Sequence, residues 1–372
     1  MSNDLRSEMR SIPLHAALVD TAGKSRGTTG SPQGRFEKAT REAFDDGWLP
    51  DDEPSPARET SVTEERARSI VSRNESPDVP FTQSINPYRG CEHGCIYCYA
   101  RPSHAYHDLS PGLDFETKIL GKQNAAELLR EELSRPGYRC ELIALGANTD
   151  PYQPVEREQR ITRGILEMLR DFKHPVGIVT KGSLVERDID ILSAMAKEGL
   201  AEVHVSIGSF DAGVARTLEP RAAAPYRRIE TIRRLAAAGI PVGVLTAPII
   251  PFLNDKDMER TLELAWEAGA RNAGYILVRL PHEVKDLFRD WLDAHVPLKA
   301  ARIMSQINQM RGGRDNDPQF GSRMTGKGLY AELLAQRFEQ ACRRIGYARA
   351  PRHQRDTTKF AVPGRATQLP LF

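Results

Sequence analysis

NPYRGCEHGCIYCYA, at residues 86–100, holds three cysteines in the spacing C-x3-C-x2-C: Cys91, Cys95 and Cys98. Two glycines in the same stretch allow the backbone to turn tightly, so the three thiolates can converge from one short loop. Three thiolates can hold three irons of a [4Fe–4S] cluster and leave the fourth iron free. That free position suits a small molecule that offers an amine and a carboxylate. The spacing therefore predicts an iron–sulfur site.

A structural zinc site is the competing interpretation of the same cysteines. Zinc in such sites takes four ligands, and His93, His104 or His107 would supply the fourth. The protein would then be a non-catalytic, zinc-stabilised module that binds nucleic acid. Metal content separates the two hypotheses, because an iron–sulfur protein contains iron and sulfide.

The composition indicates a globular protein with ample material for a core. The chain has 372 residues, of which 40% are hydrophobic and 27% are charged. Its five cysteines are too few and too clustered for a disulfide scaffold. No apolar run approaches the ~20 residues of a membrane span, and the N-terminus lacks a signal-peptide pattern. We expect a soluble, cytoplasmic protein with no membrane partner.

Composition also divides the chain into three parts. Residues 1–75 are rich in Gly, Ser, Pro and charge, and we expect them to be disordered. Residues 76–280 are expected to form a core barrel, and residues 281–372 a helical, basic extension with a flexible tail. From 299 to 372 the net charge is +9, whereas the whole chain carries +2. A nucleic-acid partner and a solvated helical tail both explain this charge.

Short apolar runs alternate with helical patterns through the central part. The strand-like runs are 79–85, 141–146, 176–180, 202–207, 242–246 and 273–278. Apolar residues at helical spacing lie between them, for example at 161–169 and 229–236, and the clearest C-terminal helix is 329–345. This alternation predicts an α/β fold, either a parallel barrel or a doubly wound sheet.

The sequence resembles the radical SAM superfamily, whose signature is C-x3-C-x-aromatic-C, with Tyr97 at the aromatic position. Within it, the chain is similar to the spore photoproduct lyase and DNA repair photolyase-like branch. The similar segments, beyond the cysteine stretch, are NTDPYQPVE at 148–156, TKG at 180–182 and VSI at 205–207. The likeness covers roughly residues 75–280.

This resemblance implies a partial (β/α)6 TIM-type barrel that binds a [4Fe–4S] cluster and S-adenosylmethionine (SAM). The cluster, held by Cys91, Cys95 and Cys98, would reductively cleave SAM to methionine and a 5′-deoxyadenosyl radical. That radical would abstract hydrogen from a substrate, either nucleic acid or protein. The resemblance also implies an electron donor such as flavodoxin or ferredoxin. A SAM-dependent enzyme that modifies RNA is an alternative, although such enzymes usually carry a further cysteine or domain.

Polar residues follow the predicted strands, where barrels of parallel strands have their active sites. Asn148, Thr149 and Asp150 follow the second strand, Lys181 follows the third, and Ser206 ends the fourth. The resemblance implies that Thr149 contacts the amino-acid part of SAM, Lys181 its carboxylate, and Ser206 its ribose or carboxylate. The structural alternatives are a turn cap for Thr149 and Asp150, an exposed cation for Lys181 and a satisfied strand-end hydroxyl for Ser206.

Two tyrosines flank the last cysteine of the loop. Tyr97 and Tyr99 are the catalytic candidates, which would shield the cluster or relay hydrogen, and Tyr97 would also place its backbone near adenine. Glu219 and Arg221, in LEPR at 218–221, would either reach the site or form an ion pair within their loop, and we expect the ion pair. The spore lyase has a hydrogen-donating cysteine at the position of Ala147, so the same repair reaction is not expected here.

Overall fold

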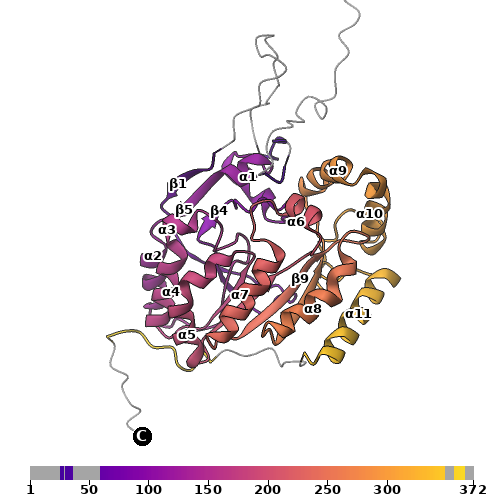
Figure 1. The fold of residues 1–372 in the computed structure, drawn as a ribbon. Helices are drawn as coiled ribbons and strands as arrows, with labels where there is room; N and C mark the ends of the chain where they lie inside the picture. Colours follow the sequence, from indigo (N-terminus) through magenta and orange to yellow (C-terminus); the bar gives the residue numbers. More distant parts are fainter. Residues whose placement is uncertain (1–25, 29, 37–58, 348–355, 365–372) are drawn as a thin grey trace, which may run out of the picture.

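The structure, a computed structural model, describes residues 26–28, 30–36, 59–347 and 356–364. Its centre is a seven-stranded sheet (Figure 1). In spatial order the strands are β10 (Asn272–Leu277), β9 (Val242–Ile249), β8 (Ala201–Ser206), β7 (Val176–Thr180), β6 (Ile143–Leu145), β3 (Gln83–Ile85) and β2 (Val71–Arg73).

Six of these strands, β3 and β6 to β10, are parallel, and each pairs with the next one along the chain. Parallel neighbours need a crossover connection, which helices supply here. β2 runs antiparallel to β3 at one edge of the sheet. Within the described residues the two edges do not pair with each other, so the sheet is open. The predicted α/β fold with a partial (β/α)6 barrel is confirmed.

Helices connect the parallel strands and cover the outside of the sheet (Figure 1). The longer ones are α2 (Ala125–Leu133), α4 (Ile161–Asp171), α5 (Ile189–Lys197), α7 (Pro225–Ala237) and α8 (Met258–Glu267). Shorter elements are α1 (Leu113–Thr117), α3 (Glu156–Gln159), α6 (Ala212–Leu218) and the 3₁₀ turns η1 (Arg101–His107), η2 (Ser183–Asp188) and η3 (Asp255–Asp257).

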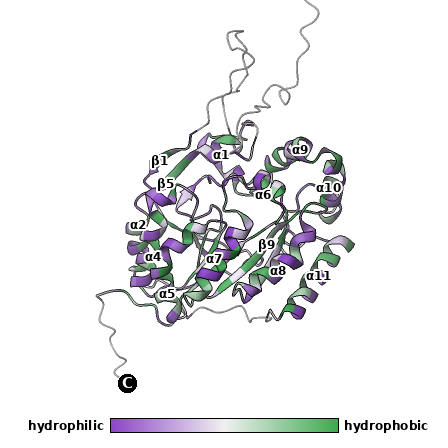
Figure 2. Cartoon of the chain, viewed as in Figure 1, coloured by the Kyte–Doolittle hydropathy of each residue, from purple (hydrophilic) through white to green (hydrophobic). Residues whose placement is uncertain are grey.

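The sequence pattern explains why these helices pack on the sheet. In α4, Ile161, Ile165, Leu166 and Leu169 are buried on one face, and Arg170 is exposed. Figure 2 shows this mixture of hydrophobic and hydrophilic residues along the helices around the sheet. The apolar faces and the strands form the main core. None of the described helices is long and apolar enough to span a bilayer.

Each predicted strand overlaps an observed one, and the bounds differ most at two of them. The run at 79–85 forms only the short β3, whereas the run at 242–246 extends to Ile249. The predicted helix at 329–345 is α11 (Leu329–Ile345). With α9 (Val284–His295) and α10 (Pro297–Met310), it forms the helical part after the sheet, where α11 packs on α8.

Part of the N-terminal segment that the sequence predicts to be disordered is built into the fold. β1 (Ser61–Glu65) pairs with β5 (Lys118–Lys122), which also pairs with β4 (Tyr88–Arg89), and β2 extends the main sheet. The prediction is therefore wrong for residues 59–75, whose short, charged strands are stabilised by pairing with distant ones. Residues 1–25, 29 and 37–58 lie outside the described residues.

The end of the chain also differs from the predicted flexible tail. Phe360 stacks on Phe172 and contacts His174 edge-on, and the Ala361 N–H donates to the Phe172 carbonyl. Residues 356–364 are thus packed against the main fold. Residues 348–355 and 365–372 lie outside the described part.

Candidate metal and cofactor site

The cysteine loop follows β3 and β4, at the edge where the parallel strands end. Cys91 and Cys95 are buried and Cys98 is partly buried. Gly90 adopts a φ of +79°, and a Cβ there would lie 2.9 Å from the Ile119 Cδ1 atom. The tight turn predicted from the glycines is present.

Two buried side chains fix the backbone of this loop. Arg101 donates from Nε to the Cys95 carbonyl (2.9 Å) and pairs through Nη2 with Glu116 (2.6 Å). Gln153 donates to the Gly90 carbonyl (3.1 Å) and accepts the Glu92 N–H (2.9 Å). Both anchors are completely buried, so the loop is held before any cofactor binds.

A third support comes from residues 26–28 and 30–36, which we call the N-terminal strap. The backbone N–H groups of Gly27 and Thr28 donate to the two carboxylate oxygens of Glu116 (2.9 and 3.1 Å). A Cβ at Gly27 would lie only 1.7 Å from the Gly94 carbonyl oxygen. The strap therefore lies directly against the cysteine loop. At its other end Arg35 pairs with Glu283, just before α9 (2.8 Å).

The three thiols are held in their neutral form by their surroundings. Burial, aided by Asp150, raises the pKa of Cys91 well above its ordinary value, and burial with Glu219 nearby raises the pKa of Cys95 to about 12. Burial also raises the pKa of Cys98. Metals bind thiolates, so metal binding here must displace protons.

These residues fit an iron–sulfur cluster by donor type. Within the described residues, no group of three or more Cys, His, Asp or Glu side chains is drawn together as a finished metal site. The three thiols nevertheless interact, because Cys95 and Cys98 both raise the pKa of Cys91. The carboxylate and imidazole of the same loop are engaged elsewhere: Glu92 pairs with Arg221 (2.9 Å) and His93 Nδ1 faces Asp150 (3.3 Å). The cysteine sulfurs are therefore the side-chain atoms of the loop that remain available to bind a metal.

Thr149 and Asp150 lie between β6 and α3, in hydrogen bonds with neighbouring loops. The Thr149 hydroxyl donates to the Tyr88 carbonyl (2.9 Å), and the residue is 1% exposed. Asp150 accepts from the Tyr152 N–H (2.8 Å), which is the turn cap considered from the sequence. With its proton committed, Thr149 can only accept a hydrogen bond from a ligand.

Asp150 is the centre of a buried polar cluster. It accepts from the Thr180 hydroxyl and the Lys181 N–H, both at 2.7 Å. Burial raises its pKa, but His93 and these donors outweigh that effect and hold the pKa at about 2. The carboxylate is therefore charged and joins the ends of β6 and β7.

Lys181 directs its ammonium group toward the cysteine loop. The ammonium nitrogen lies 5.9 Å from the Tyr97 ring centroid, and its charge lowers the pKa of Cys95 and Cys98. No carboxylate of the described residues forms an ion pair with it within 4.0 Å. It is thus a partly buried cation at the loop, rather than the exposed surface lysine of the structural alternative.

Ser206 ends β8 and is 2% exposed. Its hydroxyl donates to the Ala247 carbonyl (2.9 Å), which is the satisfied strand-end hydroxyl considered from the sequence. Its remaining lone pairs can accept from a ribose hydroxyl but cannot serve a carboxylate.

The two tyrosines beside Cys98 have different surroundings. Tyr97 is 8% exposed, and its hydroxyl donates to Glu219. Tyr99 is 46% exposed, and its hydroxyl donates to the Ala147 carbonyl after β6. One ring is therefore packed inside the site and the other is open at its edge.

The predicted Glu219–Arg221 ion pair is not formed. Glu219 pairs with Arg228 from α7 (2.5 Å), and Arg221 pairs with Glu92. Glu219 thus pairs with α7, and Arg221 pairs with the cysteine loop.

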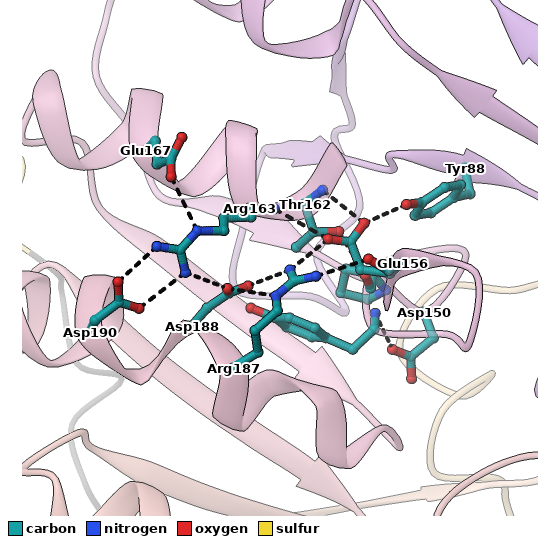
Figure 3. A network of polar contacts seen from close by, with 11 residues as sticks. Tyr88, Asp150, Glu156, Thr162, Arg163, Glu167, Arg187, Asp188 and Asp190 are labelled. Atoms are coloured by element: carbon teal, nitrogen blue, oxygen red, sulfur yellow. Dashed lines mark hydrogen bonds and ion pairs between the residues drawn. The ribbon is translucent and has the colours of Figure 1, made fainter. Parts of the chain in front are cut away.

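A buried network beneath the site connects the strand ends to the helices (Figure 3). Tyr88, next to the cysteine loop, donates to Glu156, which also accepts from Arg187 (2.7 Å). Arg187 pairs with Asp188 (2.8 Å), which in turn pairs with Arg163 of α4 (2.9 Å). Sequence reasoning singled out the segment that contains Glu156 but missed its role as a buried anchor.

Comparison with known protein families identifies one domain of the chain. The model of the radical SAM superfamily matches residues 85–265, which contain the cysteine loop and the strands β4 to β9. Residues 85–265 form a radical SAM domain. This superfamily consists of enzymes, and spore photoproduct lyase, whose structure is similar to this chain, is one of them.

Relatives of the radical SAM domain occur in bacteria and archaea. An uncharacterized protein of Mycobacterium tuberculosis is 38% identical over 216 residues, which are 58% of this chain and 64% of the relative. An uncharacterized protein of Methanocaldococcus jannaschii is 27% identical over 190 residues, or 51% of this chain and 68% of that protein. The chain thus spans just under two thirds of the first relative's length.

Solved structures support the same fold. A mutant of spore photoproduct lyase has a TM-score of 0.54 and 15% identity, covering 76% of this chain and 79% of the lyase. Its complex with a dinucleoside spore photoproduct has a TM-score of 0.51, 16% identity and the same coverage. At this identity the likeness concerns the fold. At position 147, where the resemblance places the lyase's hydrogen-donating cysteine, this chain has alanine.

Proposed function

We propose that this protein is a radical SAM enzyme whose cysteines Cys91, Cys95 and Cys98 hold a [4Fe–4S] cluster, with SAM bound at the free iron. When bound, this cofactor pair supplies a 5′-deoxyadenosyl radical that abstracts hydrogen from a nucleic-acid or protein substrate. The observation that carries the proposal is one glycine-turned loop with three thiols, at the edge where six parallel strands end.

The charges around the loop support SAM binding. Lys181 is a cation without a carboxylate partner among the described residues, and it suits the carboxylate of SAM. Thr149 and Ser206 can accept hydrogen bonds, which suits the ammonium group and the ribose hydroxyls. Asp150 keeps the Lys181 backbone in place, so it acts as a positioning residue.

The tyrosines support the proposed shielding of the site. Tyr97 is packed between the loop and the Lys181 ammonium group, and Glu219 fixes its hydroxyl, so it excludes water from the cysteine side. Tyr99 has an exposed ring face and suits contact with the substrate. An electron donor such as flavodoxin or ferredoxin, and a cytoplasmic location, complete the proposal.

Two observations favour this proposal over a zinc module. His93, one candidate fourth ligand, faces Asp150, and His104 is hydrogen-bonded to the Lys118 carbonyl (3.0 Å).

The test is metal analysis joined to SAM cleavage. Anaerobically reconstituted protein is expected to contain about four irons and four sulfides and, once reduced, to form 5′-deoxyadenosine from SAM. Cys95→Ala should lose the cluster absorbance, whereas Cys140→Ala, outside the loop, should keep it. Colourless protein with one zinc, or reconstituted protein that leaves SAM intact, would overturn the proposal.

A further inference from the structure

Arg279 stands at the same edge of the sheet as the cysteine loop. It follows β10 by two residues, and its guanidinium lies 5.4 Å from the Tyr99 ring centroid. The Tyr99 hydroxyl is bound to the Ala147 carbonyl after β6, which fixes the ring. The guanidinium is thereby placed beside the residue that follows Cys98.

This guanidinium lacks the acceptors that its donors need. Its Nε is buried without a hydrogen-bond partner, and Nη1 reaches only the Met324 sulfur at 3.7 Å. No carboxylate of the described residues lies within ion-pair distance of it. Burial, with Arg323 nearby, lowers its pKa, although a guanidinium remains charged at neutral pH. A charge in these surroundings is unfavourable until an anion meets it.

Two cations therefore face the two tyrosines beside Cys98. Lys181 lies over Tyr97, on the buried side, where we propose that it binds the SAM carboxylate. Arg279 lies over Tyr99, on the open side, and no cofactor group is assigned to it. Its position suits an anion that enters with the substrate.

A second aromatic ring at this edge is also backed by a guanidinium. Phe320 is 59% exposed, and the Arg323 guanidinium lies 4.5 Å from its ring centroid. The Leu277 N–H donates to the Met324 carbonyl (2.9 Å), which joins this segment to the end of β10. Arg323 is already paired with Asp78 (2.5 Å), so Arg279 is the one of the two whose charge lacks a carboxylate partner among the described residues.

We propose that Arg279 binds a phosphodiester group of a nucleic-acid substrate, while the open ring of Tyr99 stacks on an unpaired base. Exposed aromatic rings beside arginines are typical of sites for single-stranded nucleic acid, because every base offers a stacking face and every linkage a charge. An acidic peptide would satisfy Arg279 but would leave both rings unused. The inference rests on the proposed function, since it concerns the substrate side of the same site.

The test measures binding of fluorescent single-stranded DNA and RNA 12-mers to the reconstituted protein by anisotropy at several salt concentrations. Arg279→Gln should weaken binding roughly tenfold and reduce the slope of log K against log[salt] by about 0.7, as for one lost phosphate contact. Arg271→Gln is the matched control. Arg271 precedes β10 at the opposite end of the strand, and its guanidinium lies 4.3 Å from the Trp266 ring centroid. The Arg271→Gln variant should bind the oligonucleotides with an affinity within twofold of that of the wild type.

Several results would overturn the inference. These are wild-type protein that binds neither oligonucleotide, equal binding by the Gln variant, and Arg279-dependent binding of a poly-glutamate peptide alone. SAM cleavage without oligonucleotide is measured in parallel. If only the Arg279→Gln variant loses SAM cleavage, Arg279 belongs to the SAM site and its substrate role is rejected. If the wild-type protein does not cleave SAM, the proposed function itself is rejected. Preference for DNA or RNA identifies which nucleic acid is bound, and either supports the inference.

Discussion

The carboxylate of Asp150 accepts a 2.7 Å hydrogen bond from the backbone N–H of Lys181. This bond joins the turn after β6 to the end of β7 and sets the point from which the lysine side chain extends. A charged, buried acceptor with three further contacts makes a rigid joint.

Asp150→Asn is expected to lower the free energy of unfolding by about 1–3 kcal/mol, because an amide brings donors to a site that has only donors. Urea denaturation checks the change. Asp171→Asn is the control, because that exposed carboxylate at the end of α4 pairs only with the adjacent, exposed Arg170. Equal stability of the two variants would show that the joint contributes nothing.

Lys181→Met should weaken SAM binding about 10- to 100-fold, because a carboxylate would lose its charged partner. Equilibrium dialysis with labelled SAM measures the loss, and iron content should stay at the wild-type value. Lys173→Met is the matched control, since Lys173 is exposed and pairs with Glu198. Unchanged SAM affinity in Lys181→Met would contradict the role given to this lysine.

Gly27→Ala should disturb the cysteine loop, because the added Cβ would collide with the Gly94 carbonyl. We expect a destabilisation of about 1–3 kcal/mol and faster loss of iron in air, followed by absorbance. Gly30→Ala provides a sharp comparison, since a Cβ at Gly30 meets nothing within 4 Å. If the two variants lose iron at the same rate, the strap does not support the loop.

The buried His174 should make the protein sensitive to mild acid. Burial lowers the pKa of His174 to about 4, whereas an unfolded chain keeps the ordinary value of 6.5. Between these values the unfolded state binds a proton that the folded state does not. Stability is therefore complete above pH 6.5 and falls by on the order of 3 kcal/mol as the pH approaches 4.

His174→Asn removes this titration, so its unfolding free energy should change less over the same interval. Denaturant unfolding at several pH values gives the comparison. Equal slopes for the wild type and the variant would assign the acid sensitivity to other groups.

The sequence was sufficient for the features that depend on short stretches of chain. Most of the six parallel strands are compact runs rich in β-branched and apolar residues, although β3 is not, and the cysteine spacing lies within one loop. The anchors could not be predicted in this way. Gln153 and the Gly90 carbonyl are 63 residues apart, and Gly27 and Glu116 are 89 apart, so only the folded chain brings them together.

Hydrogen-bond partners that are distant in the sequence were likewise not predictable, even for side chains whose place at a strand end was predicted. Thr149 and Ser206 were identified as candidates because they stand at strand ends. The Thr149 hydroxyl donates to the Tyr88 carbonyl in β4, and the Ser206 hydroxyl donates to the Ala247 carbonyl in β9. Charge alone likewise predicted an ion pair for Glu219 with the wrong arginine.

The contact between the N-terminal strap and Glu116 has a consequence for work with shortened chains. A protein cut down to residues 85–265 would keep the cysteines and the Glu116 carboxylate but lose both backbone donors that this buried carboxylate receives from Gly27 and Thr28. The smallest unit able to fold properly is therefore larger than the segment by which the family is recognised, and chimeras should exchange the strap together with α1.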